Sequence, residues 1–146
     1  MVDEKIKKDN IYIEDEKIIH IGYLDDFKSD RVINGENYIT MPGFINAHTH
    51  VAMSYFRNYG DDNDLMTWLN DYIFPAEEKL TSEIVYNASL LSFAEMIKSG
   101  TTCFADMYFF EESTIKALEI AKLRGQIARG LTSPDLNEIN LIENIN

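Results

Sequence analysis

From Phe44 onward the chain alternates apolar runs with amphipathic segments, and this alternation restricts the fold more than any other feature. The pattern predicts strands over residues 44–49, 101–106 and 126–131, and helices over residues 82–98 and 112–123. Because consecutive parallel strands need crossover helices, this order predicts a parallel sheet of the α/β class. In such sheets, ligand chemistry collects at the carboxyl ends of the strands.

Several residues support the predicted helix boundaries. Thr81 is a good N-cap for the longer helix, and Gly100 is well placed to end it. Gly125 is expected to end the second helix. Spacings of three and four predict one apolar stripe on the longer helix: Ile84, Ala88, Leu91, Ala94 and Ile97.

The first forty residues differ from the rest. Two β-branched runs, residues 11–13 and 18–21, flank a charged turn and predict a hairpin. Asn34-Gly35 indicates a further turn, and residues 38–40 are predicted to form a short strand. A lone hairpin is marginal in water, so this segment is interpreted as a small β layer and not as an independent domain.

Length and charge exclude several classes. A chain of 146 residues is too short for a complete (β/α)8 barrel, which needs about 200 residues or more. With 13 Lys and Arg against 25 Asp and Glu, the net charge of −12 argues against nucleic acid and anionic membranes as partners. No apolar run is long enough for a membrane span, and the first residues do not resemble a secretory signal. The single cysteine, Cys103, cannot form an internal disulfide, so a cytoplasmic location is expected.

Two histidines close the first predicted parallel strand. His48 and His50 are two residues apart, so both imidazoles should point to the same side of the strand and could bind one metal ion. Asn46 is predicted on that side as well. The alternative is that His48-Thr49-His50 is only a polar entrance to a loop.

Residues 41–50, MPGFINAHTH, resemble the first barrel strand of the amidohydrolase superfamily. The resemblance covers nearly the whole chain and looks most like the methylthioadenosine/S-adenosylhomocysteine deaminase and chlorohydrolase branch. It implies an incomplete (β/α)8 TIM barrel of about three βα units over residues 42–146, preceded by part of a small β domain over residues 1–41. The further matching segments are 56–62, 65–69, 74–77, 99–108 and 128–131.

The same resemblance implies roles for individual residues. His48 and His50 match two metal ligands, Glu77 matches a carboxylate that binds a nucleoside sugar, and Arg129 matches an arginine at the far end of the substrate. Trp68 falls where that branch lines its pocket. The alternatives are a solvated helix carboxylate for Glu77, a surface ion pair for Arg129 and a core side chain for Trp68.

Other polar and aromatic residues are given structural roles. Asp106 is expected to cap or hydrogen-bond the loop that follows its strand. Tyr108, Phe109 and Phe110 could line a cleft, but packing is the better expectation for an aromatic cluster. Cys103 has no role in the implied chemistry.

The implied chemistry is hydrolysis of a non-peptide carbon–nitrogen bond, with deamination of an adenosine-type or related amino-heteroaromatic small molecule as the expected reaction. It uses one divalent metal ion, for which zinc is the first expectation and iron or another ion an alternative. The superfamily's further metal and catalytic ligands are not in this chain, whose remaining histidine is His20. Residues 134–146 also lack the second pocket arginine. The ligand set is therefore incomplete, and the chain alone is expected to be inactive.

Two other hypotheses stay open. The chain could be a non-catalytic fragment or interaction module that kept the start of the fold and lost the site. It could also be a small doubly wound domain in which the two histidines are incidental. For the barrel fragment, uncovered strand edges and apolar faces predict self-association or pairing with a complementing C-terminal part.

Overall fold

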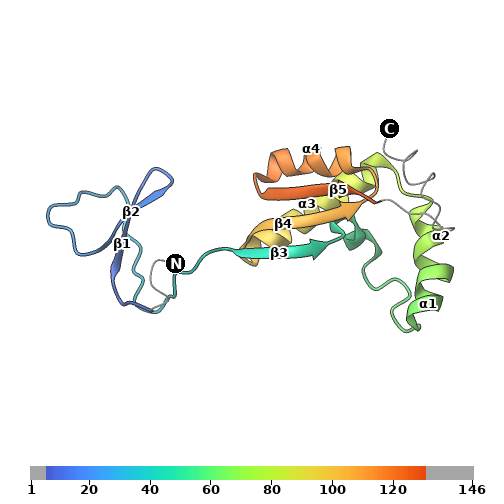
Figure 1. Ribbon diagram of the computed structural model, residues 1–146, viewed down its shortest axis with the longest axis horizontal. Coiled ribbons are helices and arrows are strands. Elements are labelled where there is room, and N and C mark those ends of the chain that lie inside the picture. Colours follow the sequence, from blue (N-terminus) through green and yellow to red (C-terminus); the bar gives the residue numbers. More distant parts are fainter. Residues whose placement is uncertain (1–5, 131–146) are drawn as a thin grey trace, which may run out of the picture. The chain divides into compact units, whose positions relative to one another are not determined.

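The computed structural model describes residues 6–130, and the chain divides into two compact units, Met1–Thr40 and Met41–Asn146. The first unit contains a two-stranded hairpin, and the second contains a three-stranded sheet with helices (Figure 1). Each unit is described by itself below.

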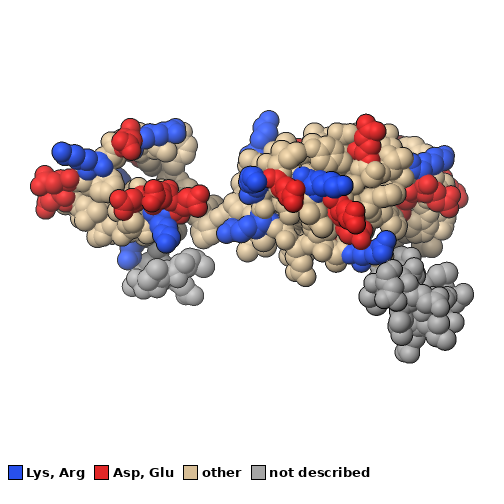
Figure 2. Space-filling view, turned by 90° about the horizontal axis from the view of Figure 1, so that it is seen from above, with Lys and Arg blue, Asp and Glu red and all other residues tan. Residues whose placement is uncertain are grey.

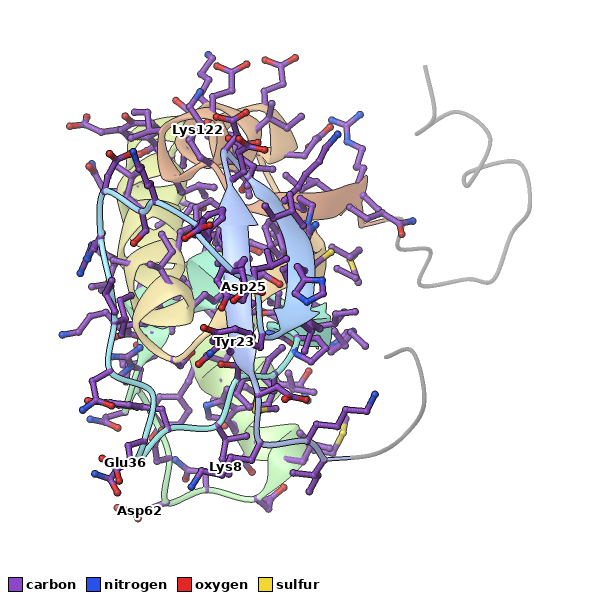
Figure 3. All side chains as sticks on the ribbon, turned by 90° about the vertical axis from the view of Figure 1, so that its left-hand side faces the viewer. Lys8, Tyr23, Asp25, Glu36, Asp62 and Lys122 are labelled. Carbon is purple, nitrogen blue, oxygen red and sulfur yellow. The ribbon has the colours of Figure 1, made fainter. Side chains whose placement is uncertain are left out.

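The hairpin consists of β1 (Asn10–Glu14) and β2 (Lys17–Gly22), paired antiparallel as predicted. Tyr23 and Asp25 follow the second strand (Figure 3). The predicted strand over residues 38–40 is wrong, because this segment pairs with no strand among the described residues. Its Tyr38 amide instead donates to the Gly35 carbonyl at 3.0 Å, which closes the turn predicted at Asn34-Gly35.

The second unit is built on a parallel sheet, which confirms the predicted α/β class. Its strands are β3 (Phe44–Thr49), β4 (Thr101–Tyr108) and β5 (Arg124–Arg129), hydrogen-bonded in that order. Both strand pairs are parallel, so the chain crosses over through a helix each time (Figure 1). The helical segments are η1 (Val51–Phe56), α1 (Leu65–Thr67), η2 (Trp68–Ile73), α2 (Phe74–Glu77), α3 (Ser82–Lys98) and α4 (Glu111–Ala121).

Helix α3 has the predicted ends but not the predicted buried face. Thr81 Oγ1 accepts from the Ile84 amide at 3.3 Å, and Gly100 follows the helix with a φ of +83°. The predicted stripe is partly wrong, since Leu91 and Ile97 are half exposed. The buried residues are instead Val85, Ala88, Ser89, Ser92 and Phe93. Serines can be buried here because each has a partner: Ser92 donates to the Val51 carbonyl at 2.7 Å, and Ser89 pairs with Thr114 of α4.

The boundary between α4 and β5 also differs from the prediction. Helix α4 ends at Ala121, and Lys122 takes the left-handed conformation that Gly125 was expected to supply. Gly125 lies inside β5, opposite Phe104. A Cβ at Gly125 would lie 2.5 Å from the Phe104 ring, so the glycine is needed for close packing.

Two apolar clusters form the core of this unit. One gathers around Ala52, Val85 and Tyr108, and the other around Phe93 and Phe104. Basic and acidic side chains are interspersed on the face shown in Figure 2. Within residues 6–130, no helix is both long and apolar enough to cross a membrane.

Candidate metal and substrate site

The two histidines meet at the carboxyl end of β3. His48 lies in the strand and His50 directly follows it, and their ring centroids are 4.9 Å apart with an 82° angle between planes. The ring of His48 is exposed and that of His50 is half-buried. The sequence placed the pair correctly, and the observed spacing allows both rings to reach one ion.

A backbone carbonyl orients the second ring. His50 Nδ1 lies 2.5 Å from the carbonyl oxygen of Met107 in the neighbouring strand β4. A carbonyl oxygen only accepts, so Nδ1 is the donor, and in the neutral imidazole Nε2 then carries the free lone pair. Such a hydrogen bond fixes the tautomer and the ring orientation in metal-binding histidines. His50 is therefore ready to act as a ligand through Nε2.

Asp106 holds the turn that follows His50. Its Oδ1 accepts from the Val51 amide at 2.7 Å, and the residue is 5% exposed. Burial raises the pKa of the Asp106 carboxyl, while the Val51 hydrogen bond and the nearby His50 oppose that rise. The structural role predicted for Asp106 is found, but the loop that it binds follows β3 and not β4.

Tyr108, the last residue of β4, joins the histidines to Glu77. Its hydroxyl donates to Glu77 Oε1 at 2.6 Å, and its ring centroid lies 5.7 Å from that of His50. Burial and the Glu77 carboxylate both raise the pKa of the Tyr108 phenol, so this group keeps its proton and acts as a donor. Glu77, half-buried at the end of α2, is thus brought to the same region as His50.

The other two predicted residues have different partners. Arg129 is opposite Tyr108 in the register of β5, and its Nε lies 3.5 Å from Glu111 Oε1. Trp68 is half-buried in η2, where its indole N–H donates to the Tyr59 carbonyl at 2.9 Å. Among residues 6–130, the ring contacts of His50 and Tyr108 do not extend to Trp68.

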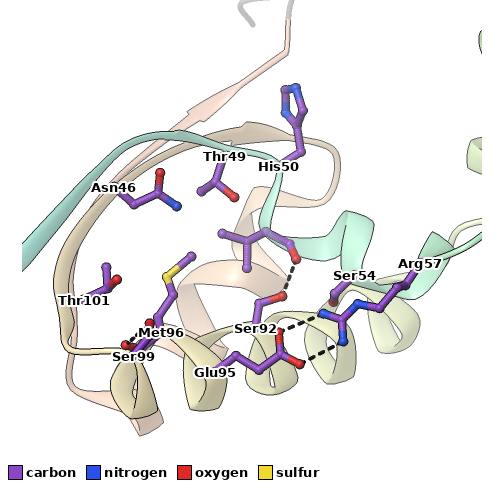
Figure 4. A pocket seen from close by; sticks show the side chains of 11 residues that line it. Asn46, Thr49, His50, Ser54, Arg57, Ser92, Glu95, Met96, Ser99 and Thr101 are labelled. Atoms are coloured by element: carbon purple, nitrogen blue, oxygen red, sulfur yellow. Dashed lines mark hydrogen bonds and ion pairs between the residues drawn. The ribbon is translucent and has the colours of Figure 1, made fainter. Parts of the chain in front are cut away.

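A hollow of about 500 Å³ lies between β3 and α3, and His50 is among the residues that line it. Arg57 and Glu95 form a bidentate ion pair beside it, at 2.9 and 2.8 Å. Asn46 lines this hollow (Figure 4), and its Oδ1 accepts from the His48 amide at 3.4 Å. Asn46 therefore contacts the backbone of the histidine segment, in keeping with its position two residues before His48. The register between Asn46 and Thr49 is irregular, which interrupts the strict alternation of the strand.

The described residues do not form a complete metal site. Within residues 6–130, no group of three or more His, Cys, Asp or Glu side chains is arranged to hold an ion. A catalytic zinc site normally has three protein ligands and an open position. The two imidazoles fit as a portion of such a set, with His50 already oriented.

The amidohydrolase family pattern matches residues 39–145, which is more than half of the chain. The chain therefore belongs to the amidohydrolase family.

Its relatives include two groups of deaminases. The chain is 50% identical to a 5-methylthioadenosine/S-adenosylhomocysteine deaminase of Caldanaerobacter subterraneus subsp. tengcongensis, over 94% of this chain and 32% of that protein. It is 51% identical to a 5'-deoxyadenosine deaminase of Methanosarcina mazei, over 86% of this chain and 29% of that protein. The chain thus spans about a third of the length of the curated relatives that it matches.

Solved structures agree with the fold. An adenosine deaminase from Xanthomonas campestris with bound zinc matches with 38% identity and a TM-score of 0.56, over 58% of this chain and 20% of that one. The atrazine chlorohydrolase from Arthrobacter aurescens TC1, complexed with zinc, matches over 95% of this chain and 37% of that one, with a TM-score of 0.68. Its 18% identity supports a likeness of fold alone.

The sequence analysis underestimated Tyr108. It assigned this residue to packing, which is correct for the ring but misses the hydrogen bond to Glu77. A signal was available, because Asp106 and Tyr108 are two residues apart at the end of one strand, as His48 and His50 are. The Met107 carbonyl could not be found in this way, since a backbone group has no signature in the sequence.

Proposed function

We propose that this chain is the N-terminal part of a metal-dependent hydrolase that deaminates an adenosine-type nucleoside or a related amino-heteroaromatic compound. The observation that carries the proposal is the pair of imidazoles at the carboxyl end of β3, with His50 Nε2 left free by the Met107 hydrogen bond. Relatives that share about half of their aligned residues with this chain are deaminases of adenosine-type compounds.

His48 and His50 are proposed to hold one divalent ion, with zinc favoured because the adenosine deaminase from Xanthomonas campestris contains it. When bound, such an ion supplies Lewis-acid activation of water near neutral pH. Glu77 is proposed to accept hydrogen bonds from the sugar, and Arg129 and Trp68 to contact other parts of the substrate. The remaining ligands and the acid–base groups are proposed to come from a complementing C-terminal part, so that the isolated chain is inactive.

The metal proposal can be tested on the chain itself. We expect zinc to shift the imidazole NMR signals of His48 and His50, and we expect His48→Ala or His50→Ala to weaken zinc binding strongly. His20→Ala is the matched control, because His20 lies in the hairpin and should leave binding unchanged. Equal binding by all three variants would contradict the proposal.

Activity can be tested in a chimaera. The chain replaces the matching N-terminal third of the Caldanaerobacter relative, and ammonia release is measured with methylthioadenosine and S-adenosylhomocysteine. We expect an active chimaera, loss of activity with His50→Ala, and no turnover by the isolated chain. An inactive chimaera that folds and binds zinc would count against the proposed function, and so would ammonia release by the isolated chain at a catalytic rate.

A further inference from the structure

The buried ring of Tyr108 fixes the position of the Tyr108 hydroxyl. The ring is 5% exposed and belongs to the cluster formed by Ala52, Val85 and their neighbours. Buried packing leaves the ring little freedom, so the position of the hydroxyl is set by the core. From there the hydroxyl donates to Glu77 Oε1 at 2.6 Å.

Glu77 depends on this contact for its orientation. It is the last residue of the four-residue helix α2, and a glutamate side chain has several rotatable bonds that cost free energy to order. Among residues 6–130, Tyr108 is the one side chain that donates a hydrogen bond to the Glu77 carboxylate. The bond occupies Oε1, which leaves Oε2 available to a ligand.

Tyr108 also contacts the proposed metal ligand. Its ring lies 5.7 Å from the ring of His50, with a 40° angle between planes. One buried side chain therefore contacts both His50 and the Glu77 carboxylate. It sets the separation between the place where the ion would sit and the place where a second part of the substrate would bind.

We propose that Tyr108 is a positioning residue that holds Glu77, the carboxylate proposed above to bind the sugar, in the orientation that accepts from a sugar hydroxyl. This inference rests on the proposed function. A carboxylate already held in one rotamer loses little conformational freedom when Oε2 accepts from a sugar hydroxyl, whereas a carboxylate that changes rotamer loses more.

Tyr108→Phe in the chimaera tests the inference, because it removes the hydroxyl and keeps the ring. We expect KM for methylthioadenosine to rise about tenfold, the size of one hydrogen bond to a charged group, with kcat within about twofold. We expect no change in KM for the 2',3'-dideoxy analogue. Glu77→Gln should also raise KM for methylthioadenosine. In the double variant, Tyr108→Phe should raise this KM little further.

Tyr86→Phe is the matched control. Tyr86 is half-buried in α3 and packs on the other apolar cluster, and its hydroxyl has no hydrogen bond within the described residues. We expect this variant to keep both KM values. An equal rise in KM for methylthioadenosine and its dideoxy analogue with Tyr108→Phe would overturn the positioning role, and so would the absence of any rise.

A second measurement does not depend on activity. In the full 146-residue chain, side-chain scalar couplings should report one dominant Glu77 rotamer, and Tyr108→Phe should produce averaging over several. Averaging already present in the unsubstituted chain would overturn the inference. An inactive chimaera with an ordered Glu77 would count against the proposed function while supporting the positioning by Tyr108.

Discussion

At the scale of single residues, the site depends on hydrogen bonds between strand ends. The Met107 carbonyl selects the tautomer of His50, and the Asp106 carboxylate holds the amide that follows it. Each contact gives a polar group one orientation. The histidine pair is therefore organised by its neighbours in β4 before any ion binds.

Asp106 offers the clearest stability test. Asp106→Ala leaves the buried Val51 amide without an acceptor, so we expect the free energy of unfolding to fall by about 1–3 kcal/mol. Asp106→Asn keeps an acceptor oxygen and should lose less. Urea unfolding followed by circular dichroism measures both variants. Equal losses would show that the charge matters and the hydrogen bond does not.

The Arg57–Glu95 pair predicts a pH effect. The hydrogen bond from Arg57 lowers the pKa of the Glu95 carboxyl below its ordinary 4.5. A lowered pKa in the folded state contributes stability above the ordinary value, and this stability is lost as the pH falls through the lowered pKa. The pair is exposed, so the contribution to stability is small.

Carboxyl carbon NMR titration checks this effect directly. We expect the Glu95 midpoint to lie below 4.5 and to move toward 4.5 in Arg57→Gln. Lys116→Gln changes the same charge on α4 and is the control, with no expected shift. An unchanged Glu95 titration midpoint in the Arg57→Gln variant would contradict the observed pairing.

At the scale of elements, packing decided which residues face inward and where strands begin. Helix α3 can bury Ser89 and Ser92 because Thr114 and Val51 supply their hydrogen-bond partners. Leu91 lies on the other side of the helix and is half exposed. Strand β5 begins at Arg124, since it pairs in register with Cys103 of β4. Local apolar spacing carries no information about such partners.

Gly125 gives a prediction about the contact between two strands. Gly125→Ala puts a methyl group against the Phe104 ring, so we expect a loss of about 1–3 kcal/mol in the free energy of unfolding. Phe104→Leu removes the ring atoms involved, so the double variant should lose less than the sum of the two single variants. Additive losses in urea unfolding would rule out the clash as the cause.

At the scale of the whole molecule, the parallel sheet ends in two outer strands among the described residues. The chain spans about a third of its relatives, and β3 and β5 are the outer strands of the sheet within residues 6–130. Apolar side chains on β3 are exposed, with Phe44 at 55% and Ile45 at 73%. An edge of this kind pairs readily with another chain.

Self-association is therefore expected for the isolated chain. Ile45→Lys places a charge on the β3 edge and should shift the chain toward the monomer in light scattering at a fixed concentration. Ile120→Lys is the control, because Ile120 is 62% exposed on α4 and does not lie on a strand edge. If both variants shift the chain toward the monomer equally, the shift is caused by the added net charge and not by the strand edge.

The sequence by itself determined the features that depend on neighbouring residues. The N-cap at Thr81, the left-handed Gly100 and the hairpin around Asp15 were predictable, because capping and turn formation act within a few residues. The order of strands and helices and the position of His48 and His50 followed from the same local patterns. The motifs around these residues also sufficed for the family.

Only the tertiary structure decided the contacts between distant segments. His50 and Met107 are 57 residues apart, Asp106 and Val51 are 55 apart, and Tyr108 and Glu77 are 31 apart. Such pairs depend on strand register, which is irregular between Asn46 and Thr49 of β3. Register is set by packing across the whole sheet, and apolar periodicity within one segment does not encode it.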